Sequence, residues 1–345
     1  MSTQTQKATL LPMLELSGLK PITSNEEPPR FACDVCALLR WSAPRPGSCR
    51  IIGRVIPSRE TAAFNPSPAF GLLLDVDGPI ASPVSRTVAI ASISRDLAAM
   101  ANRGIPVIFN TGRSDDFIAQ QVIPPLRESG LLDSAPVFTV SEKGAVWAEV
   151  TPASLGEVHI DEKLKLPAGL AEDVRELVAE RFGNLMFFDE TKRSMISVEQ
   201  SVQVHNSEYL EAQQEFDAAI PGLLEKHRLG DVRIDPTIIS TDIEHQRVGK
   251  DLGAERALSL LEARGITAES WFTMGDSRSD YAMATWLHRR GIPVSHVDVR
   301  PADGIPDTPY QVLTSRTGAL HDEAGAEFLS LWARGAATIR AGRQS

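Results

Sequence analysis

The chain has 345 residues, of which 42% are hydrophobic and 23% charged, a composition typical of a globular protein with a sizeable core. Its 35 basic and 45 acidic residues give a formal net charge of −10, which argues against nucleic acid as a partner but allows a small phosphorylated ligand held by local positive charge. No stretch approaches the roughly 20 apolar residues of a membrane span, and no basic region followed by an apolar run marks a secretory signal, so we expect no membrane partner and a cytoplasmic location.

Residues 1–68 contain Pro-rich and Ser/Arg-rich pieces without sustained periodicity, and we expect a poorly ordered extension. The 3 cysteines all lie there, at Cys33, Cys36 and Cys49. The Cys33–Cys36 spacing suits zinc, but the further ligands that close a structural zinc site are missing. Unremarkable thiols in a loose tail are the simpler interpretation, and three cysteines do not make a disulfide framework.

Strand and helix patterns alternate from residue 70 onward. Continuous apolar runs predict buried strands at 70–76, 105–111 and 135–140, with a helix at 85–104 between the first two. A second helix, at 114–130, is disturbed by Pro124 and Pro125. The alternation predicts a doubly wound, Rossmann-like parallel sheet with helices on both faces, the α/β class.

The rhythm changes between residues 151 and 240, where two strands joined by a turn at 190–192 lie between two helical stretches. Adjacent strands flanked by helices predict a separate α+β unit inserted in the larger fold. Strand and helix alternation then resumes. We therefore expect a core made of residues 69–150 and 241–340, and an inserted domain at 151–240.

Polar clusters stand where ligands bind to parallel sheets, outside the carboxyl ends of strands. They are Asp75 with Asp77, Thr111 with Gly112 and Arg113, Lys250, and Asp276 with Asp280. Each cluster alone has an ordinary explanation as a turn, a surface ion pair, a helix cap or a solvated lysine. The four together, in this order, indicate a site whose carboxylates suit Mg²⁺ and whose lysine and hydroxyl suit a phosphate.

These clusters resemble the four motifs of the haloacid dehalogenase-like superfamily of phosphohydrolases, over about residues 70–335. "DVDG" is similar to the first motif, "FNTGRS" to the second, Lys250 to the third and "GDSRSD" to the fourth. The insert resembles the large α+β cap of the branch that includes Cof-type, trehalose-, sucrose- and mannosylglycerate-phosphate phosphatases. "VSEKGAVW" resembles the "NGA" segment of that branch, with Glu142 and Lys143 in place of the usual Asn.

The resemblance implies a role for each core residue. Asp75 would be the nucleophile that forms an aspartyl-phosphate, and Asp77 the general acid and base. Thr111, Gly112 and Lys250 would bind the phosphate. Mg²⁺ would be held by Asp75, Asp276 and the backbone carbonyl of Asp77, while Asp280 would orient Lys250 or a metal-bound water.

The substrate would be chosen by the cap, and three cations are candidate contacts: Arg113, and Lys192 with Arg193 at the predicted hairpin turn. A solvated charged turn is the alternative for the last two. Asp242, Glu244 and His245, shortly before Lys250, are further candidates.

The resemblance predicts a Mg²⁺-dependent phosphatase acting on a small phosphorylated metabolite, with a sugar phosphate as the leading class. Asp77 argues against dehalogenation, because a departing halide needs no proton whereas an alkoxide does. A phosphomutase of the phosphomannomutase type and a non-catalytic sugar-phosphate-binding regulator remain open. The sequence leaves the oligomeric state open.

Overall fold

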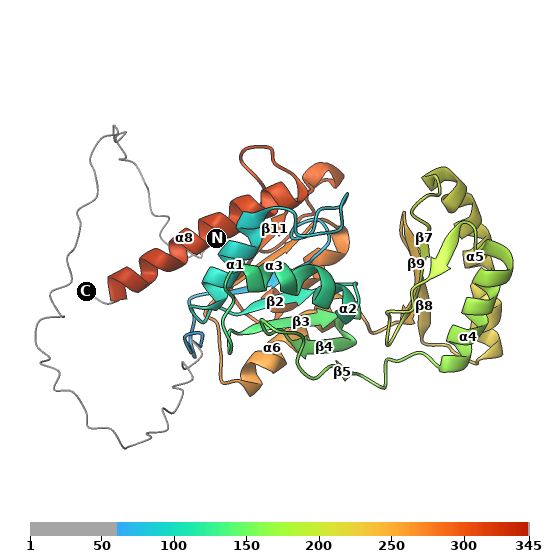
Figure 1. Cartoon of the computed structure of the whole chain (residues 1–345), viewed down its shortest axis with the longest axis horizontal. Helices are drawn as coiled ribbons and strands as arrows, with labels where there is room; N and C mark the ends of the chain where they lie inside the picture. Colours follow the sequence, from blue (N-terminus) through green and yellow to red (C-terminus); the bar gives the residue numbers. More distant parts are fainter. Residues whose placement is uncertain (1–60, 344–345) are drawn as a thin grey trace, which may run out of the picture. The chain divides into compact units, whose positions relative to one another are not determined.

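A mostly parallel sheet forms the centre of the computed structural model, which describes residues 61–343, with side chains up to residue 336 (Figure 1). Within the described residues it has eight strands. In spatial order they are β12 (Gln311–Leu313), β11 (Val294–Asp298), β10 (Trp271–Gly275), β1 (Gly71–Leu74), β2 (Val107–Asn110), β3 (Val137–Ser141), β4 (Val146–Glu149) and β5 (His159–Ile160). All neighbouring pairs from β12 to β3 are parallel, whereas β4 and β5 are added antiparallel at one edge.

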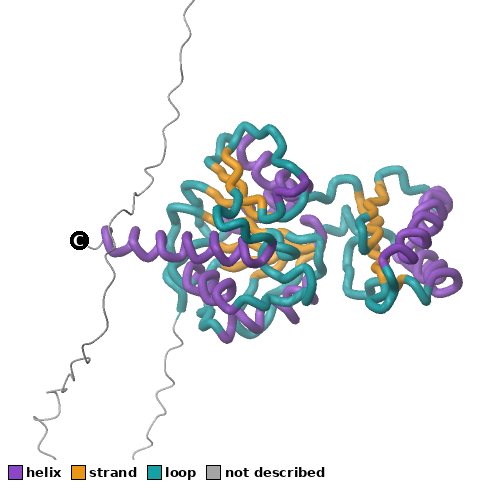
Figure 2. The backbone as a smooth tube through the Cα atoms, turned by 90° about the horizontal axis from the view of Figure 1, so that it is seen from above, coloured by secondary structure: helices purple, strands orange, loops and turns teal. Residues whose placement is uncertain are grey.

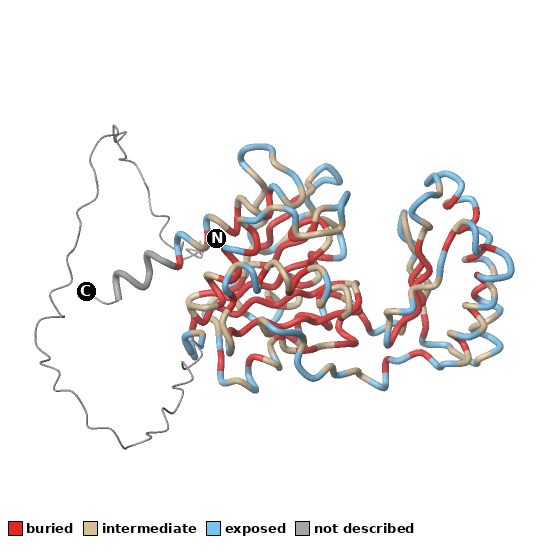
Figure 3. Tube along the Cα trace, in the orientation of Figure 1, coloured by how far each residue is buried: buried red, intermediate tan, exposed pale blue. Residues whose placement is uncertain are grey.

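Successive residues of the central strands face opposite sides of this sheet, and each side packs against its own helices. Leu72 and Leu74 of β1 belong to one hydrophobic cluster, and Leu73 belongs to another. Helices α1 (Ala91–Ala101), α3 (Ile123–Glu128) and α8 (His321–Arg343) pack on the first side, and α6 (Lys250–Ala263) and α7 (Tyr281–Arg289) on the second (Figure 1). The central strands are buried along their length, as Figure 3 shows. The predicted doubly wound α/β class is confirmed.

A second sheet lies in the segment between β5 and α6. Among the described residues it has four antiparallel strands, in the order β6 (Met186–Phe188), β7 (Ile196–Gln200), β9 (Ser240–His245) and β8 (Val232–Pro236). Helices α4 (Ala168–Leu177) and α5 (Asn206–Lys226) cover one face of this sheet (Figure 2) and share a hydrophobic core with it. The elements of both sheets belong to one compact unit.

Residues 61–68, which the sequence assigns to the loose extension, are bonded to the main sheet's surroundings. The N–H of Ala62 donates to the carbonyl of Asp133 at 2.8 Å, and the carbonyls of Pro66 and Pro68 accept from Thr267 and Glu269 at 2.8 and 2.9 Å. These backbone bonds form without hydrophobic periodicity, which is why the pattern misses them. The three cysteines lie outside the described residues.

The predicted helix at 114–130 forms in three pieces. They are α2 (Asp115–Phe117), a π-helical turn (Ile118–Val122) and α3. Pro124 and Pro125 lack backbone N–H groups, so the turn ahead of them widens instead of continuing the regular ladder. In the part of the chain that the structure describes, none of the helices combines the length and apolar character needed to cross a bilayer.

Candidate active site

The site lies where the direction of the main sheet's connections reverses. β1 pairs with β2 on one side and β10 on the other, and all three run parallel. Asp75 directly follows β1, Thr111 follows β2, and Asp276 follows β10. The sheet topology therefore brings these three residues to one edge, at the switch point where doubly wound folds bind ligands.

Lys250 connects the residues of this edge. It is the first residue of α6, and its side chain is buried. Its Nζ lies 2.6 Å from Oδ1 of Asp75 and 2.8 Å from Oδ1 of Asp280, and it donates to the backbone carbonyl of Asn110 at 2.8 Å. In return, the side-chain amide of Asn110 donates to the carbonyl of Lys250 at 2.9 Å. These contacts fix the ammonium group between the ends of β1, β2 and β10.

The two carboxylates that share Lys250 differ in their pKa. Burial raises the pKa of Asp75 well above its ordinary value, and the charges of Asp280 and Asp77 act in the same direction against Lys250. Burial also opposes ionisation of Asp280, but Lys250 and the hydrogen bonds from Ser277 outweigh it and lower the pKa of that carboxyl. Asp75 is therefore the more basic of the two, and a more basic carboxylate is the stronger nucleophile.

Asp276 is partly buried beside the turn that follows β1. Burial and the charge of Asp280 raise its pKa to about 6, while Arg300 and Lys250 act in the opposite direction. Gly78 in the turn has φ of 89°, and a Cβ there would lie 2.7 Å from the carboxyl carbon of Asp276. Only glycine accommodates both the left-handed backbone and this close approach.

Asp77 is held by Arg113. The Nε and Nη2 of the guanidinium donate to the two carboxylate oxygens at 2.8 and 3.1 Å, a bidentate pair. Nη1 of Arg113 also donates to Oε1 of Glu199, in β7 of the second sheet, at 3.4 Å. Glu199 lies 3.5 Å from Nη1 of Arg86 as well. A chain of charged groups thus runs from the second sheet to Asp77.

Thr111 and Gly112 form the loop after β2. The hydroxyl oxygen of Thr111 accepts the N–H of Arg113 at 3.1 Å, which leaves the hydroxyl proton to donate elsewhere. The carbonyl of Gly112 accepts from Nζ of Lys192 at 2.7 Å. Thr111 is buried, so any ligand it contacts is largely removed from water.

The three cations expected to contact substrate have partners within the chain. Arg113 is bound to Asp77, and Lys192 to the carbonyl of Gly112. Nε of Arg193 donates to Oδ1 of Asp115 at 2.6 Å, and its Nη2 lies 3.5 Å from Asp116. In this arrangement all three join the two sheets to one another.

Sequence reasoning did not identify Asn110 and Glu199, and it left Glu142 and Lys143 without a role. Asn110 precedes a predicted site residue at a strand end, a position that could have drawn attention to it. Glu199 is an ordinary polar residue of an alternating strand, and nothing in its sequence context indicates its partner. The contact of Glu199 becomes visible only when the two sheets are placed together, and that of Asn110 when the start of α6 is placed beside the end of β2.

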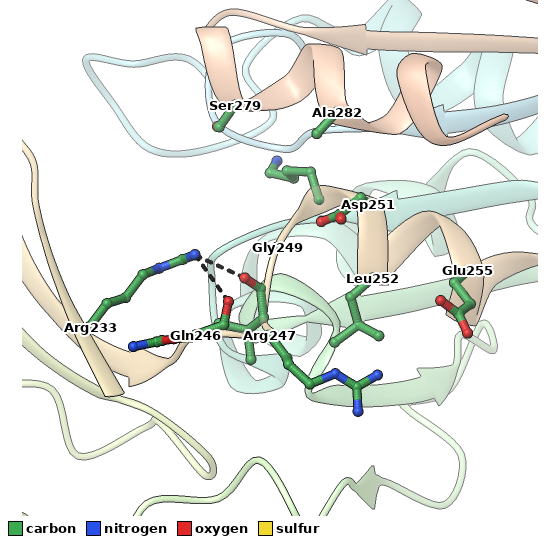
Figure 4. A pocket seen from close by; sticks show the side chains of 11 residues that line it. Arg233, Gln246, Arg247, Gly249, Asp251, Leu252, Glu255, Ser279 and Ala282 are labelled. Atoms are coloured by element: carbon green, nitrogen blue, oxygen red, sulfur yellow. Dashed lines mark hydrogen bonds between the residues drawn. The ribbon is translucent and has the colours of Figure 1, made fainter. Parts of the chain in front are cut away.

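A cavity of about 450 Å³ opens beside Lys250 (Figure 4). Arg233 lines it and donates to the carbonyls of Gln246 and Val248 at 3.3 and 2.8 Å. Arg247, Asp251, Glu255 and Ser279 also line the cavity. Charges of both signs surround it, so it suits a polar group rich in hydroxyls better than an apolar one.

No protein-family profile matches this sequence, and no curated protein matches it by sequence. Solved structures do match. The C-terminal domain of trehalose-6-phosphate phosphatase from C. albicans is 14% identical, with 80% of this chain and 99% of that one covered and a TM-score of 0.55. Trehalose-6-phosphate phosphatase from Aspergillus fumigatus is 15% identical, with 80% and 100% covered and a TM-score of 0.46. Sucrose-phosphatase from Synechocystis is 16% identical, with 76% and 97% covered and a TM-score of 0.44.

At this identity the likeness to the C. albicans domain shows the fold. A doubly wound parallel sheet carries the candidate site, and an antiparallel sheet with two helices follows β5. The chain therefore shares its fold with the C-terminal domain of C. albicans trehalose-6-phosphate phosphatase.

Proposed function

We propose that this protein is a Mg²⁺-dependent phosphatase that hydrolyses a small phosphorylated metabolite, with sugar phosphates as the first class, through an aspartyl-phosphate intermediate. The observation that carries the proposal is the buried contact of Lys250 with Asp75 and Asp280, at 2.6 and 2.8 Å, with Asp77 two residues beyond Asp75. A nucleophile, a cation and a second carboxylate converge there at the edge of a parallel sheet.

In the first step, a carboxylate oxygen of Asp75 attacks phosphorus and the bond from phosphorus to the ester oxygen breaks. Asp77 gives its proton to the departing alkoxide, which leaves as an alcohol. The hydroxyl of Thr111 and the ammonium of Lys250 bind phosphoryl oxygens and offset their charge. Arg113 positions Asp77 through its two hydrogen bonds.

In the second step, the carboxylate of Asp77 takes a proton from water, and the water oxygen attacks phosphorus. The bond from phosphorus to Asp75 breaks, which regenerates the aspartate and releases inorganic phosphate. Asp77 ends the cycle protonated, as it began. The net reaction consumes one ester and one water and yields an alcohol and phosphate.

The residues present fit Mg²⁺. Carboxylate oxygens of Asp75, Asp276 and Asp280 lie within 4.8 Å of one another. Those of Asp280 are bonded to Lys250 and Ser277, whereas the carboxylate of Asp276 has a longer contact with His321, whose Nδ1 lies 3.6 Å from Oδ2. Asp75, Asp276 and the carbonyl of Asp77 would hold the ion with hard oxygen ligands. When bound, it would reduce repulsion between the nucleophile and the anionic substrate.

The second sheet and its helices would form the cap that covers the site. The boundary expected at residue 240 falls at the first residue of β9, a strand that pairs with both β7 and β8. A cut there would remove a central strand from the second sheet. We therefore place the end of the cap after β9, before the start of α6 at Lys250.

A phosphate-release assay tests the proposal. The wild type is incubated with a panel of sugar phosphates and an aryl phosphate, with Mg²⁺ or with EDTA, beside Asp75→Asn. Asp307→Asn, on an exposed loop, is the matched control. We expect phosphate release by the wild type and the control, loss of at least about a thousandfold in Asp75→Asn, and loss in EDTA that added Mg²⁺ reverses.

Inactivity of the wild type across the whole panel, or equal rates for Asp75→Asn and the wild type, would overturn the proposal. Formation of an isomeric sugar phosphate in place of released phosphate would indicate a phosphomutase. Binding of a sugar phosphate without any turnover would indicate a regulator.

A further inference from the structure

Glu142 and Lys143 stand in an unusual turn between β3 and β4. Their φ angles are 48° and 53°, and Gly144 follows with 103°. The left-handed region disfavours residues that carry a Cβ, and among them asparagine tolerates it best. Backbone of this kind persists where surrounding contacts hold it in place. Contacts of Glu142 and Lys143 with their surroundings should therefore stabilise this turn.

The backbone of the turn supports the two loops of the candidate site. The N–H of Glu142 donates to the carbonyl of Arg113 at 3.0 Å, and the N–H of Lys143 to the carbonyl of Thr111 at 2.9 Å. The carbonyl of Lys143 accepts the N–H of Gly249, the residue before Lys250, at 2.8 Å. A displacement of the turn would thus reach the loop after β2 and the start of α6 together.

The side chain of Glu142 binds the hairpin between β6 and β7. Its carboxylate is fully buried and accepts three consecutive backbone N–H groups, from Arg193 and Ser194 at 2.8 Å each and from Met195 at 3.1 Å. Three N–H donors on one carboxylate form a charge-assisted anchor. This residue of the main sheet thereby fixes the position of the cap hairpin.

The side chain of Lys143 binds the other half of the second sheet. Its Nζ lies 2.7 Å from Asp235 in β8, and 3.0 Å and 2.8 Å from Asp242 and Glu244 in β9. Asp235 and Asp242 are directly paired across the two strands. Like charges opposite one another in a sheet repel, so the lysine compensates a cluster that the cap alone would leave strained. Arg233, 2.6 Å from Glu244, supplies the second positive charge.

We propose that Glu142 and Lys143 are positioning residues, and we call this pair the clasp. Together they fix the cap to the core and keep the loop after β2 in the position relative to the cap that substrate binding requires. Glu142 holds the β6–β7 hairpin, and Lys143 holds β8 and β9. The docking itself depends only on the contacts above. Its kinetic consequence rests on the proposed phosphatase function.

Hydrogen–deuterium exchange of the full chain tests the docking directly. In Glu142→Gln, one acceptor oxygen becomes an N–H₂ group that faces the hairpin donors, and exchange in residues 191–195 should quicken by roughly tenfold or more. Lys143→Met should quicken exchange in 232–245, and Lys143→Arg should restore protection. The exposed neighbours Glu162→Gln and Lys163→Met are the matched controls. Unchanged exchange in both clasp variants would overturn the proposal.

Kinetics separate positioning from general stability. For the sugar phosphate that the wild type turns over best, both clasp variants should lose roughly tenfold in kcat/KM, mainly through KM, because the cap no longer closes over it. Turnover of a small aryl phosphate should fall much less. Lys143→Met with Asp242→Asn, which leaves less surplus charge in the cap, should show the same selective loss.

An equal fall for both substrates in folded variants, or no fall for either, would contradict the positioning role. An inactive wild type would instead overturn the proposed function. The exchange experiment would still show whether Glu142 and Lys143 fix the cap to the core.

Discussion

At the residue scale, one lysine contacts two aspartates whose pKa values are shifted in opposite directions. Lys250 contacts Asp75 and Asp280 at nearly equal distances, but Asp280 also accepts hydrogen bonds from Ser277 that stabilise its ionised form. Burial raises the pKa of Asp75 and is not offset in the same way. These neighbours explain why the pKa of Asp75 is raised and that of Asp280 is lowered.

The core residues of the site could be predicted because local pattern places them. Buried strands end at Asp75 and Thr111, and parallel strand ends share an edge. The partner of Arg113 could not be predicted in this way, since Glu199 is separated from it by 86 residues and lies in the other sheet. A contact of that range depends on how the two sheets meet, which no local pattern encodes.

His296 in β11 should make stability depend on pH. Burial disfavours its charged form and lowers its pKa from 6.5 to about 4, with Asp280 and Asp298 acting in the opposite direction. The unfolded chain therefore binds more protons than the folded one between these values. This contribution to stability is present above about pH 6.5 and is lost as the pH falls toward 4, by an amount on the order of 3 kcal/mol.

Urea unfolding across that pH range measures the effect. His296→Asn removes the titrating group and keeps a hydrogen-bonding group for the hydroxyl of Thr273, which lies 2.8 Å from Nδ1. We expect a flatter decline of unfolding free energy in the variant than in the wild type. Parallel declines in the two proteins would show that His296 does not carry the dependence.

At the element scale, α8 packs directly on the turn that follows Asp77. A Cβ on Gly325 of α8 would overlap the backbone carbonyl of Pro79. Pro79 is two residues beyond Asp77, so the helix determines where this turn lies. The close approach explains a glycine within a helix, where alanine is otherwise the more stable residue.

Two substitutions in α8 should therefore have opposite effects. Gly325→Ala should destabilise the fold by about 2 kcal/mol, because backbone must shift to relieve the overlap, and should lower phosphate release. Gly335→Ala, on an exposed position with nothing within 4 Å, should stabilise by about 0.5–1 kcal/mol and leave turnover unchanged. Thermal unfolding and the phosphate assay measure both, and a tolerated Gly325→Ala would contradict the packing.

One turn in the second sheet could not be predicted from the local sequence pattern. Residues 231–240 look like one strand in the sequence, whereas the structure has β8, a turn and β9. The apolar pattern cannot place that turn, because the polar residues that follow it form the cluster around Lys143. These polar residues pair with Lys143, about a hundred residues earlier in the chain.

At the scale of the whole molecule, polar contacts join the cap to the core. They include Arg113 with Glu199, the N–H groups of the β6–β7 hairpin with Glu142, and Lys143 with its three carboxylates. Each of three hydrophobic clusters stays within its own part, and a small fourth one lies at the junction and consists of Ala145, Leu164, Val248 and Leu252. Polar contacts exchange readily for water, so we expect the cap to open for substrate and close again.

Chemical trapping of the intermediate tests the central claim most directly. Asp77→Asn, which should slow hydrolysis of the phosphoryl-enzyme, is mixed with Mg²⁺ and an aryl phosphate that the wild type turns over, because a phenolate leaves without the proton that an alkoxide needs. The mixture is quenched with acid and reduced with borohydride. Reduction converts an aspartyl-phosphate to homoserine, which peptide mass spectrometry locates. We predict homoserine at position 75 alone. An unmodified Asp75, or homoserine at another aspartate, while the wild type releases phosphate, would contradict the account.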